Sequence, residues 1–169
     1  DVNGDGYSDV IVGAYVYNSN TGRAYVFFGG LQMNNTVDVT MTGEAINDYF
    51  GFSVSSAGDV NGDGYSDLIV GAYNFSSGTG RVYLYDYFMK GNIFQDVVMT
   101  GEATYNEFGY SVSSAGDVNG DGYSDVIVGA YVYSTGTGRA YIFFGGSIMN
   151  NTADIILTGE ATDTYFGYS

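Results

Sequence analysis

The stretch DVNGDGYSD occupies residues 59–67 and recurs without change at residues 1–9 and 117–125. Side chains that carry oxygen stand at its positions 1, 3, 5 and 9, and glycines stand at positions 4 and 6. Carboxylate and amide oxygens at this spacing can surround a hard cation such as Ca2+, with help from a backbone carbonyl at position 7. Glycine at position 6 allows a sharp bend with positive φ, which a residue with a Cβ would resist. The stretch therefore predicts one calcium site per copy, three in all, with these ligands: Asp1, Asn3, Asp5, Tyr7, Asp9, Asp59, Asn61, Asp63, Tyr65, Asp67, Asp117, Asn119, Asp121, Tyr123 and Asp125.

The residues after position 9 separate this loop from other calcium motifs. An EF-hand or dockerin-like loop needs a carboxylate at position 12 and a helix after it. Position 12 is Val12, Val70 or Val128, inside a run of β-branched residues that is typical of a strand. The loop is therefore predicted to be a turn between two strands. The alternative is an Asx-rich turn without metal, which rarely needs three aspartates.

The composition is that of a globular β protein. Of 169 residues, 45% are hydrophobic and only 14% charged, with 18 Tyr, 11 Phe and 27 Gly, and without Pro, Cys, Trp or His. Aromatic and β-branched residues favour half-buried pleated surfaces. The net charge of −15 argues against nucleic acid and against anionic membrane surfaces as partners, and the three loops hold nine of the 19 acids. The absence of Cys excludes a disulfide scaffold.

The chain is an internal repeat with a period of 58 residues. Asp1, Asp59 and Asp117 begin successive units, which we set at residues 1–58, 59–116 and 117–169, each with its acidic loop first. A fixed period of this length is by itself the sequence signature of a repeat architecture. The last unit is five residues short, and a blade-shaped unit would be cyclically permuted relative to this division.

Each unit divides into four short strands and shows no helical periodicity. In the middle unit the strands are expected at residues 50–58, 67–73, 81–87 and 96–100. Four strands at this pitch are typical of a β-propeller blade. The first strand is rich in small residues, as suits the crowded centre, and the third is rich in aromatics that can fill the widening space between blades. A sandwich or a β-solenoid is the alternative, with shorter or less regular repeats.

Several motifs recur in every unit and support a family resemblance. Phe-Gly opens the first strand at residues 50–51, 108–109 and 166–167, and Val-Gly-Ala follows the loop at residues 12–14, 70–72 and 128–130. With the acidic loop, they resemble the FG-GAP repeat of integrin α-subunit-like propellers. The proline of the family's Gly-Ala-Pro is replaced by Tyr15, Tyr73 and Tyr131.

The resemblance implies a propeller, usually of seven blades, with calcium in the loop between the first and second strands. It also implies that ligands are met on the opposite face, by the loops between the second and third strands and by the inter-blade connections. We therefore expect residues 1–169 to form one all-β domain of four-stranded antiparallel blades, part of a larger propeller. Completion by other copies of the chain is the alternative, and the longer chain is favoured because an unpaired sheet edge invites aggregation.

Two charged positions repeat with the units. The arginines could bind an anionic ligand, but we expect each to pair with an acid between strands or blades while its stem covers aromatic surface. The glutamates of Gly-Glu-Ala suggest acid–base chemistry, but their repetition favours a structural hydrogen bond in each blade. These residues are Arg23, Arg81 and Arg139, and Glu44, Glu102 and Glu160.

Other segments vary between units and could carry specificity, since loops on a fixed scaffold often bind ligands. Contact with carbohydrate or protein is one interpretation and plain solvated loops are the other, so no ligand-binding residue is assigned. The variable segments are residues 46–49, 104–107, 162–165, 18–21, 76–79 and 134–137. Glycosylation sequons begin at Asn34, Asn74 and Asn150, and in an Asn- and Thr-rich chain they also arise by chance.

These observations predict a non-catalytic, calcium-binding propeller module that is extracellular or on a cell surface and serves adhesion or recognition. Open loops with three aspartates suit extracellular calcium, at about 10⁻⁴–10⁻³ M. Its partners would be an extracellular protein or carbohydrate, or further copies of the repeat, without nucleic acid or insertion into a membrane. One alternative is an architectural repeat, such as a spacer, sheath or filament coat. A propeller hydrolase or lyase lacks support, because the chain has no His, no Cys and no nucleophile motif.

Overall fold

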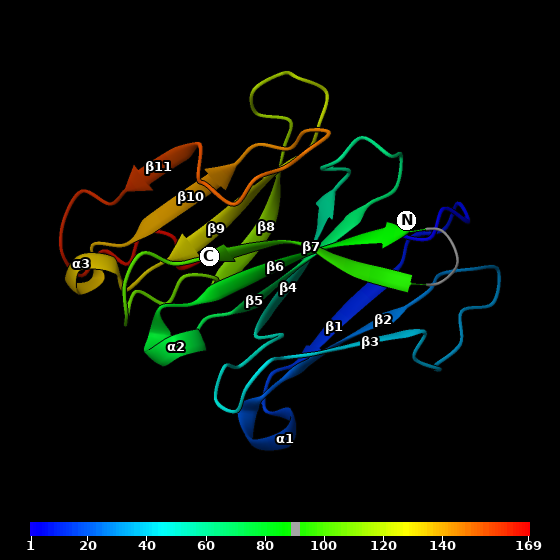
Figure 1. Cartoon of the computed structure of the whole chain (residues 1–169), viewed down its shortest axis with the longest axis horizontal. Helices are drawn as coiled ribbons and strands as arrows, with labels where there is room; N and C mark the ends of the chain where they lie inside the picture. Colours follow the sequence, from blue (N-terminus) through cyan, green and yellow to red (C-terminus); the bar gives the residue numbers. More distant parts are fainter. Residues whose placement is uncertain (89–91) are drawn as a thin grey trace.

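A computed structural model describes the backbone of residues 1–88 and 92–169 and the side chains of residues 1–86 and 95–169. These residues form three antiparallel sheets (Figure 1). The first contains β1 (Val10–Ala14), β2 (Arg23–Phe27) and β3 (Val39–Thr42). The second contains β4 (Ser53–Gly58), β5 (Asp67–Ala72), β6 (Arg81–Phe88) and β7 (Asn92–Thr100). The third contains β8 (Ser111–Gly116), β9 (Asp125–Ala130), β10 (Arg139–Phe143) and β11 (Ile155–Thr158).

Within each sheet the spatial order of the strands follows their order in the chain, and every neighbouring pair is antiparallel. Chain and spatial order agree because each connection is short enough to join neighbouring strands. The prediction of an all-β fold made of four-stranded antiparallel propeller blades is therefore confirmed, and the first sheet contributes three strands.

The strand boundaries differ from the expected ones in the middle blade. β4 begins at Ser53 rather than at residue 50, because Phe50 makes an isolated parallel bridge with Gly22 of the preceding blade. The hairpin of β6 and β7 is longer than expected, and its pairing continues to Phe88 and Asn92. In the third blade the corresponding strand ends at Phe143, and Phe144 and two glycines follow it. The middle repeat has Tyr87 and Phe88 in place of those glycines, and its hairpin continues.

The blades converge on their first strands, as the small residues of this strand predict. β4 packs against β8 of the next blade and against β1 of the preceding one. Each complete blade has a bulge near the end of this strand, where the register shifts between Ser56 and Gly58 or between Ser114 and Gly116. The bulge bends the strand just before it enters the acidic loop.

The core consists of two apolar layers, one on each side of the middle sheet. All six residues of β5 are buried, which fits a central strand covered on both faces. One layer joins the first and second sheets, through Val2, Ala24, Val26, Met41, Phe50, Leu68, Val70, Ala72, Tyr83 and Tyr85. The other joins the second and third sheets, through Ala57, Val60, Ile69, Val82, Leu84, Val97, Met99, Phe108, Val126, Val128, Ala130, Tyr141 and Phe143.

Phenylalanine of the Phe-Gly motif fills the space between blades. Phe50 is 1% exposed and its ring lies 5.3 Å from that of Tyr83, edge to face. Phe108 repeats the contact with Tyr141 at 5.2 Å. Burying such a ring stabilises the fold by about 1.5–3 kcal/mol. The expectation that aromatics of the third strand act as wedges is confirmed, with the Phe-Gly ring as their partner.

The glycines of Phe-Gly and Val-Gly-Ala bring neighbouring backbones together. The amide of Gly51 donates to the carbonyl oxygen of Gly71 at 3.0 Å, within one blade. A Cβ at Gly71 would lie 2.1 Å from the carbonyl oxygen of Gly109, at the start of the next blade. Gly13 and Gly129 face the same obstruction at 1.9 Å. The glycine of Val-Gly-Ala therefore recurs because a side chain at this position would collide with the carbonyl of the next Phe-Gly glycine.

Three short turns connect the second and third strands of the blades. They are α1 (Tyr17–Asn20), α2 (Phe75–Gly78) and α3 (Tyr133–Gly136). Each contains three residues with positive φ, for example Ser76 at 49°, Ser77 at 58° and Gly78 at 75°, so none is a regular helix. The turns lie at the end of the sheets opposite the acidic loops (Figure 1), because successive connections in an antiparallel sheet alternate between its ends. Among residues 1–88 and 92–169, none of the helices has the length and apolar content needed to cross a membrane.

Candidate functional sites

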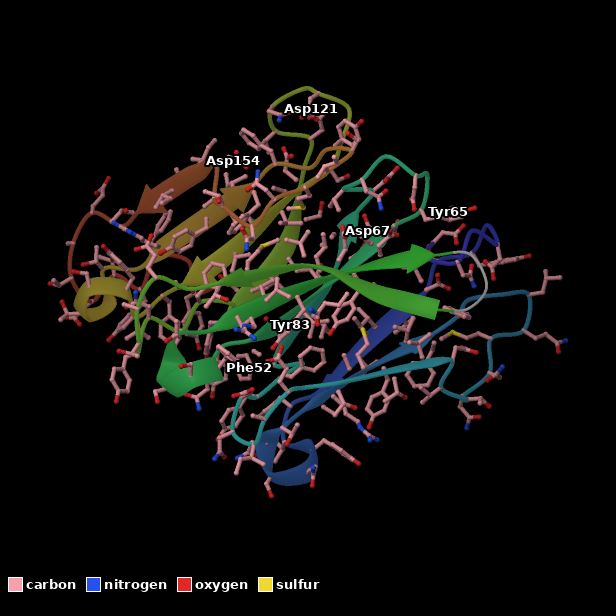
Figure 2. The ribbon with its side chains drawn as sticks, viewed as in Figure 1. Phe52, Tyr65, Asp67, Tyr83, Asp121 and Asp154 are labelled. Atoms are coloured by element: carbon pink, nitrogen blue, oxygen red, sulfur yellow. The ribbon has the colours of Figure 1, made fainter. Side chains whose placement is uncertain are left out.

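The acidic loops occupy one end of the blades. The loop at residues 59–67 connects β4 to β5, and the loop at residues 117–125 connects β8 to β9. Figure 2 shows Asp121, Tyr65 and Asp67 at this end and Phe52 toward the opposite end. The prediction that these loops are turns between two strands is correct.

Backbone amides hold the first part of each loop closed. In the middle loop the Asp59 carboxylate accepts from the amides of Gly62 at 2.7 Å and Gly64 at 2.9 Å. The Asn61 side-chain oxygen accepts from the amide of Asp63 at 2.9 Å. The carboxylate at position 5 accepts in turn from the amide at position 7, in all three loops. The structure therefore brings positions 1, 3 and 5 together around one ring of backbone.

The aspartate at position 9 lies at the base of the loop and is buried in the second and third copies. Asp125 is 0% exposed, and its two oxygens accept from the amides of Val118 at 2.8 Å and Gly145 at 2.9 Å. Asp67 is 1% exposed and accepts from the amide of Val60 at 2.8 Å, but its Oδ1 has no hydrogen-bond partner. The position-9 carboxylate thus anchors the loop, incompletely so in the middle blade.

An additional acid lies beside the middle loop. Asp86 occupies the position of Phe28 in the first repeat and Phe144 in the third, and its Oδ1 is buried without a partner. Burial raises the pKa of Asp86, and the neighbouring Asp63 raises it further. Burial also raises the pKa of Asp67 to about 8, opposed by its hydrogen bond from the Val60 amide and reinforced by the charge of Asp86.

Our sequence analysis did not identify Asp86 as a site residue. The signal was present, because aligning the units at their period of 58 residues places this acid opposite two phenylalanines.

The donor set of the loops fits a hard cation. Every candidate ligand offers oxygen, which suits Ca2+, and the glycines at positions 4 and 6 have positive φ in all three loops. The unpartnered Oδ1 of Asp67 adds a buried oxygen that no protein group satisfies. Among the residues whose side chains the structure describes, no three acidic side chains are grouped so that they could hold an ion. Carboxylates of the loops accept from backbone amides. The predicted calcium ligands therefore stay a prediction.

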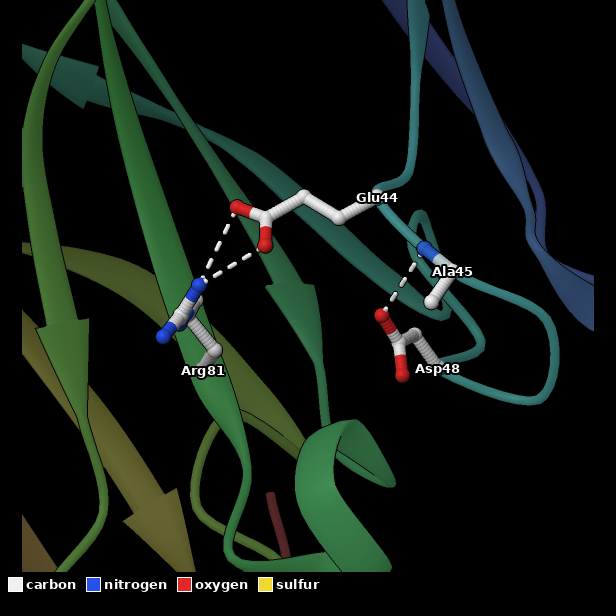
Figure 3. A network of polar contacts seen from close by, with 4 residues as sticks. All are labelled: Glu44, Ala45, Asp48 and Arg81. Carbon is white, nitrogen blue, oxygen red and sulfur yellow. Dashed lines mark hydrogen bonds and ion pairs between the residues drawn. The ribbon is translucent and has the colours of Figure 1, made fainter.

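Ion pairs join successive blades. Arg81 donates to both carboxylate oxygens of Glu44, at 2.9 and 3.1 Å (Figure 3), and Arg139 donates to Glu102 at 2.8 Å. The Arg81 guanidinium also lies 3.5 Å from the ring centroid of Phe75. Both expectations are thus confirmed for these pairs, because arginine and glutamate make a contact between blades and the arginine covers an aromatic ring.

A continuous group of aromatic rings lies at the end opposite the loops, and we call it the aromatic face. Neighbouring rings have centroids between 4.3 and 6.2 Å apart, from Tyr15–Tyr49 to Tyr110–Tyr131. The tyrosines that replace the family's proline contribute one ring per blade to the aromatic face, since each directly follows the second strand of its blade. The members of the face are Tyr15, Tyr49, Phe52, Tyr73, Tyr110, Tyr131, Tyr165 and Tyr168.

Polar groups are embedded in the aromatic face. Glu107, Tyr131, Val132, Tyr165 and Tyr168 line an open hollow. Burial raises the pKa of Glu107, and a hydrogen bond with Tyr131 opposes this shift. The hydroxyls of Tyr110 and Tyr168 lie 3.3 Å apart, and this contact, followed by burial, raises the pKa of Tyr110 to about 12. Aromatic rings with hydroxyl and carboxylate groups between them can recognise a ligand that has both apolar and polar surface.

Two of the three sequons occupy equivalent, exposed hairpins. The Asn34 side chain accepts from the amide of Thr36 at 2.6 Å, and Asn150 does the same with Thr152 at 2.7 Å. Asn74 instead donates to the carbonyl oxygen of Asn47 at 2.7 Å. Glycosylation and chance occurrence stay the two interpretations of these triplets.

Comparison with protein families identifies the repeat. The family described as FG-GAP repeat matches residues 1–27, 50–85 and 108–143. The chain belongs to the FG-GAP repeat family. Each match covers the acidic loop and the second and third strands of a blade, and the last two also cover Phe-Gly and the first strand. The resemblance noted from the sequence is therefore confirmed.

Integrin α-subunits are among the relatives of this FG-GAP chain. Human integrin alpha-11 is 34% identical over 168 residues, which cover 94% of this chain and 14% of the integrin. Mouse integrin alpha-IIb is 30% identical over 181 residues, covering 97% of this chain and 17% of the integrin. Mouse integrin alpha-8 is 41% identical over 115 residues, covering 60% of this chain and 11% of the integrin. The chain thus spans less than a fifth of the length of these relatives.

Proposed function

We propose that this FG-GAP chain is a non-catalytic propeller segment whose three acidic loops each bind one Ca2+ and whose aromatic face meets an extracellular ligand. The observation that carries the proposal is the exact repetition of the nine-residue loop at the turn between the first and second strands. A turn alone does not need three aspartates, whereas a bound cation does.

The side chains at positions 1, 3, 5 and 9 and the carbonyl at position 7 would hold the ion. The ion supplies positive charge that neutralises the loop and links its two ends. The protein supplies a closed loop in advance, because amides already orient the carboxylates at positions 1 and 5. A structural role follows, in which calcium stabilises the turn and therefore the blade.

The likeness to integrin α-subunits supports a role in adhesion or recognition at a cell surface. The ligand would be a protein or a carbohydrate, bound at the aromatic face between the turns α1, α2 and α3. Further blades, from the same chain or from other copies, would complete the propeller. Loops of this open kind suit extracellular calcium, at about 10⁻⁴–10⁻³ M.

An architectural role is the second candidate, and one observation favours it. Residues 1–17 and 117–133 are identical, including the acidic loop and a tyrosine of the aromatic face. Such uniform blades suit a spacer or coat without a dedicated ligand. Screening the calcium-loaded chain on protein and glycan arrays separates the two, because a spacer binds nothing on them, whereas a recognition module loses its signal when Tyr73 and Tyr131 are replaced by alanine.

Calcium binding is tested by thermal melting and by counting bound ions. At a calcium concentration of 100 Kd, each site adds about 2.7 kcal/mol to the free energy of unfolding. We expect EDTA to lower the melting temperature and Asp63→Ala to remove one of three ions. Glu160→Ala is the matched control, because it removes the same charge from an exposed position outside the loops. A melting curve that EDTA leaves unmoved would show that calcium has no structural role.

A further inference from the structure

The three acidic loops have the same sequence but different surroundings. In the first repeat, the amide of Gly29 donates to the Oδ1 of Asp9 at 2.8 Å, and in the third the amide of Gly145 donates to Asp125 at 2.9 Å. The equivalent residue of the middle repeat is Tyr87. The same loop is therefore closed by a glycine amide in two repeats but not in the middle one.

The obstruction around these glycines gives the reason. A Cβ at Gly29 would lie 2.3 Å from the carbonyl oxygen of Ser8, and one at Gly145 would lie 2.3 Å from that of Ser124. Any other residue must therefore hold its backbone differently at this position. Tyr87 stands at this position in the middle repeat, and its backbone amide does not donate to Asp67. The Oδ1 of Asp67 therefore has no hydrogen-bond partner.

The same change places a second unpartnered oxygen beside the first. Asp86 stands where the other repeats have phenylalanine, and its buried Oδ1 also has no partner. Its carboxyl lies beside Asn61 and Asp63, which are positions 3 and 5 of the middle loop. Asp86 is also the foremost of the acids whose charge acts on Asp67. The buried Asp67, 1% exposed, thus has a free oxygen, and the acids whose charges act on it come from two elements, the loop and β6.

Unpartnered buried carboxylate oxygens are costly unless something neutralises them. In the described part of the chain, neither lysine nor arginine is among the charges that act on Asp67 or Asp86. A bound cation would satisfy both oxygens together. The affinity of a calcium site rises with the number of charged ligands, so an added carboxylate beside a loop of this kind favours tighter binding.

We propose that Asp86 is a further cation-binding residue, which together with the free Oδ1 of Asp67 makes the middle loop the tightest of the three calcium sites. The inference rests on the proposed function, since it assumes that the loops bind calcium. It goes beyond that function by making the middle site fill first and the outer two later. The two outer repeats, with phenylalanine at this position, are built-in references.

Calcium titration of the full chain by calorimetry tests the inference, after removal of metal. We expect one site at least tenfold tighter than the other two. Asp86→Phe installs the residue of the other repeats and should lower the affinity of the middle site toward that of the outer two. Asp86→Asn keeps the shape of the side chain without its charge and should weaken the same site. Glu160→Gln is the control for charge alone and should leave the tight site intact.

Terbium luminescence provides an independent readout, because two tyrosines lie near the middle loop and can sensitise a lanthanide bound there. Tyr65 stands at its position 7, and the ring of Tyr123 from the next loop lies against Gly62. Replacing both by phenylalanine should remove the signal of the first equivalent added, whereas Tyr7→Phe should spare it. Melting in EDTA shows whether Asp86→Phe is folded, and we expect it to be at least as stable as the parent.

The outcomes separate the inference from the function beneath it. Three equal sites in the unaltered chain, or a tight site that survives Asp86→Phe, would overturn the role of Asp86 and leave calcium binding in place. Absence of any calcium binding would overturn both. A single tight site that disappears with Asp86→Phe and persists in Glu160→Gln would establish the inference.

Discussion

The middle and third blades carry the same acidic loop between their first and second strands, yet the surroundings of the two loops differ. In the third blade both oxygens of Asp125 accept backbone amides. In the middle blade Asp67 has a free oxygen and Asp86 stands beside it. The difference arises at the hairpin between the third and fourth strands, outside the loop. The repeated motif therefore provides the candidate ligands. The residues of the neighbouring hairpin differ between blades, and they determine whether the position-9 carboxylate is satisfied by backbone amides.

The opposite ends of the same blades differ in a parallel way. At the aromatic face, Glu107 occupies the position that Tyr49 and Tyr165 hold in the other repeats. It places a half-buried carboxylate among rings, with Tyr131 as its hydrogen-bond partner. Both departures from the repeat thus put a charge where the other blades have an aromatic side chain. Such replacements are the positions where near-identical blades can acquire separate roles.

The largest expected effect concerns the approach between blades. Gly71→Ala places a Cβ 2.1 Å from the carbonyl oxygen of Gly109, which is buried and fixed by its hydrogen bond to Gly129. Overpacking of this kind costs about 3 kcal/mol, or roughly 6–12 °C in melting temperature. Gly129→Ala meets Gly167 instead, which is only half-buried and can move aside, so we expect a smaller loss. Thermal melts with calcium present measure both, and equal losses would show that the two approaches are equally rigid.

A smaller effect compares the two position-9 aspartates in EDTA. Asp125→Asn leaves one of two backbone amides without an acceptor, which costs about 1–3 kcal/mol. Asp67→Asn keeps an acceptor for the Val60 amide and removes a carboxyl group whose ionisation is opposed by burial and by Asp86, so we expect the variant to be as stable as the parent or more so. Denaturant unfolding in EDTA gives both free energies. An equal loss in the two variants would mean that the free oxygen of Asp67 carries no cost.

The repeat period made most of the fold predictable. Because residues at a fixed spacing occupy equivalent places, the blades, the turn at the acidic loop and the role of Arg81 and Glu44 followed from the sequence alone. The ion pair between blades was predictable from repetition, since a residue that recurs in every unit serves a contact that recurs in every blade. The loss of the family's proline at Tyr73 was visible too, but only as a change at the entry to a loop.

Two features depend on how separate units meet, and repetition alone does not show them. The aromatic face requires rings from consecutive blades to come within about 5 Å, which depends on the angle between sheets as well as on the sequence. Asp67 ends the acidic loop, and Asp86 lies on a strand about twenty residues later in the chain. They come together in the middle blade, where the hairpin after Asp86 is longer than in the third blade. Glu107 lies in the variable segment at residues 104–107, whereas Asp86 lies in a strand and differs from its two phenylalanine equivalents at a single position.

The smallest expected effect concerns the pH dependence of stability at Glu107. Burial raises the pKa of this carboxyl above its usual 4.5, so the folded chain keeps a proton that the unfolded chain has already lost. Its contribution to stability therefore falls as the pH rises from 4.5 toward the pKa of the folded state, and stays at the lower value above it. Because solvent screens this half-exposed group, the change is below about 1 kcal/mol. Glu107→Gln should flatten this part of the profile of melting temperature against pH in EDTA, whereas Glu160→Gln should leave it unchanged. Equal slopes for Glu107→Gln and the parent would mean that the rings of the aromatic face do not desolvate the carboxyl.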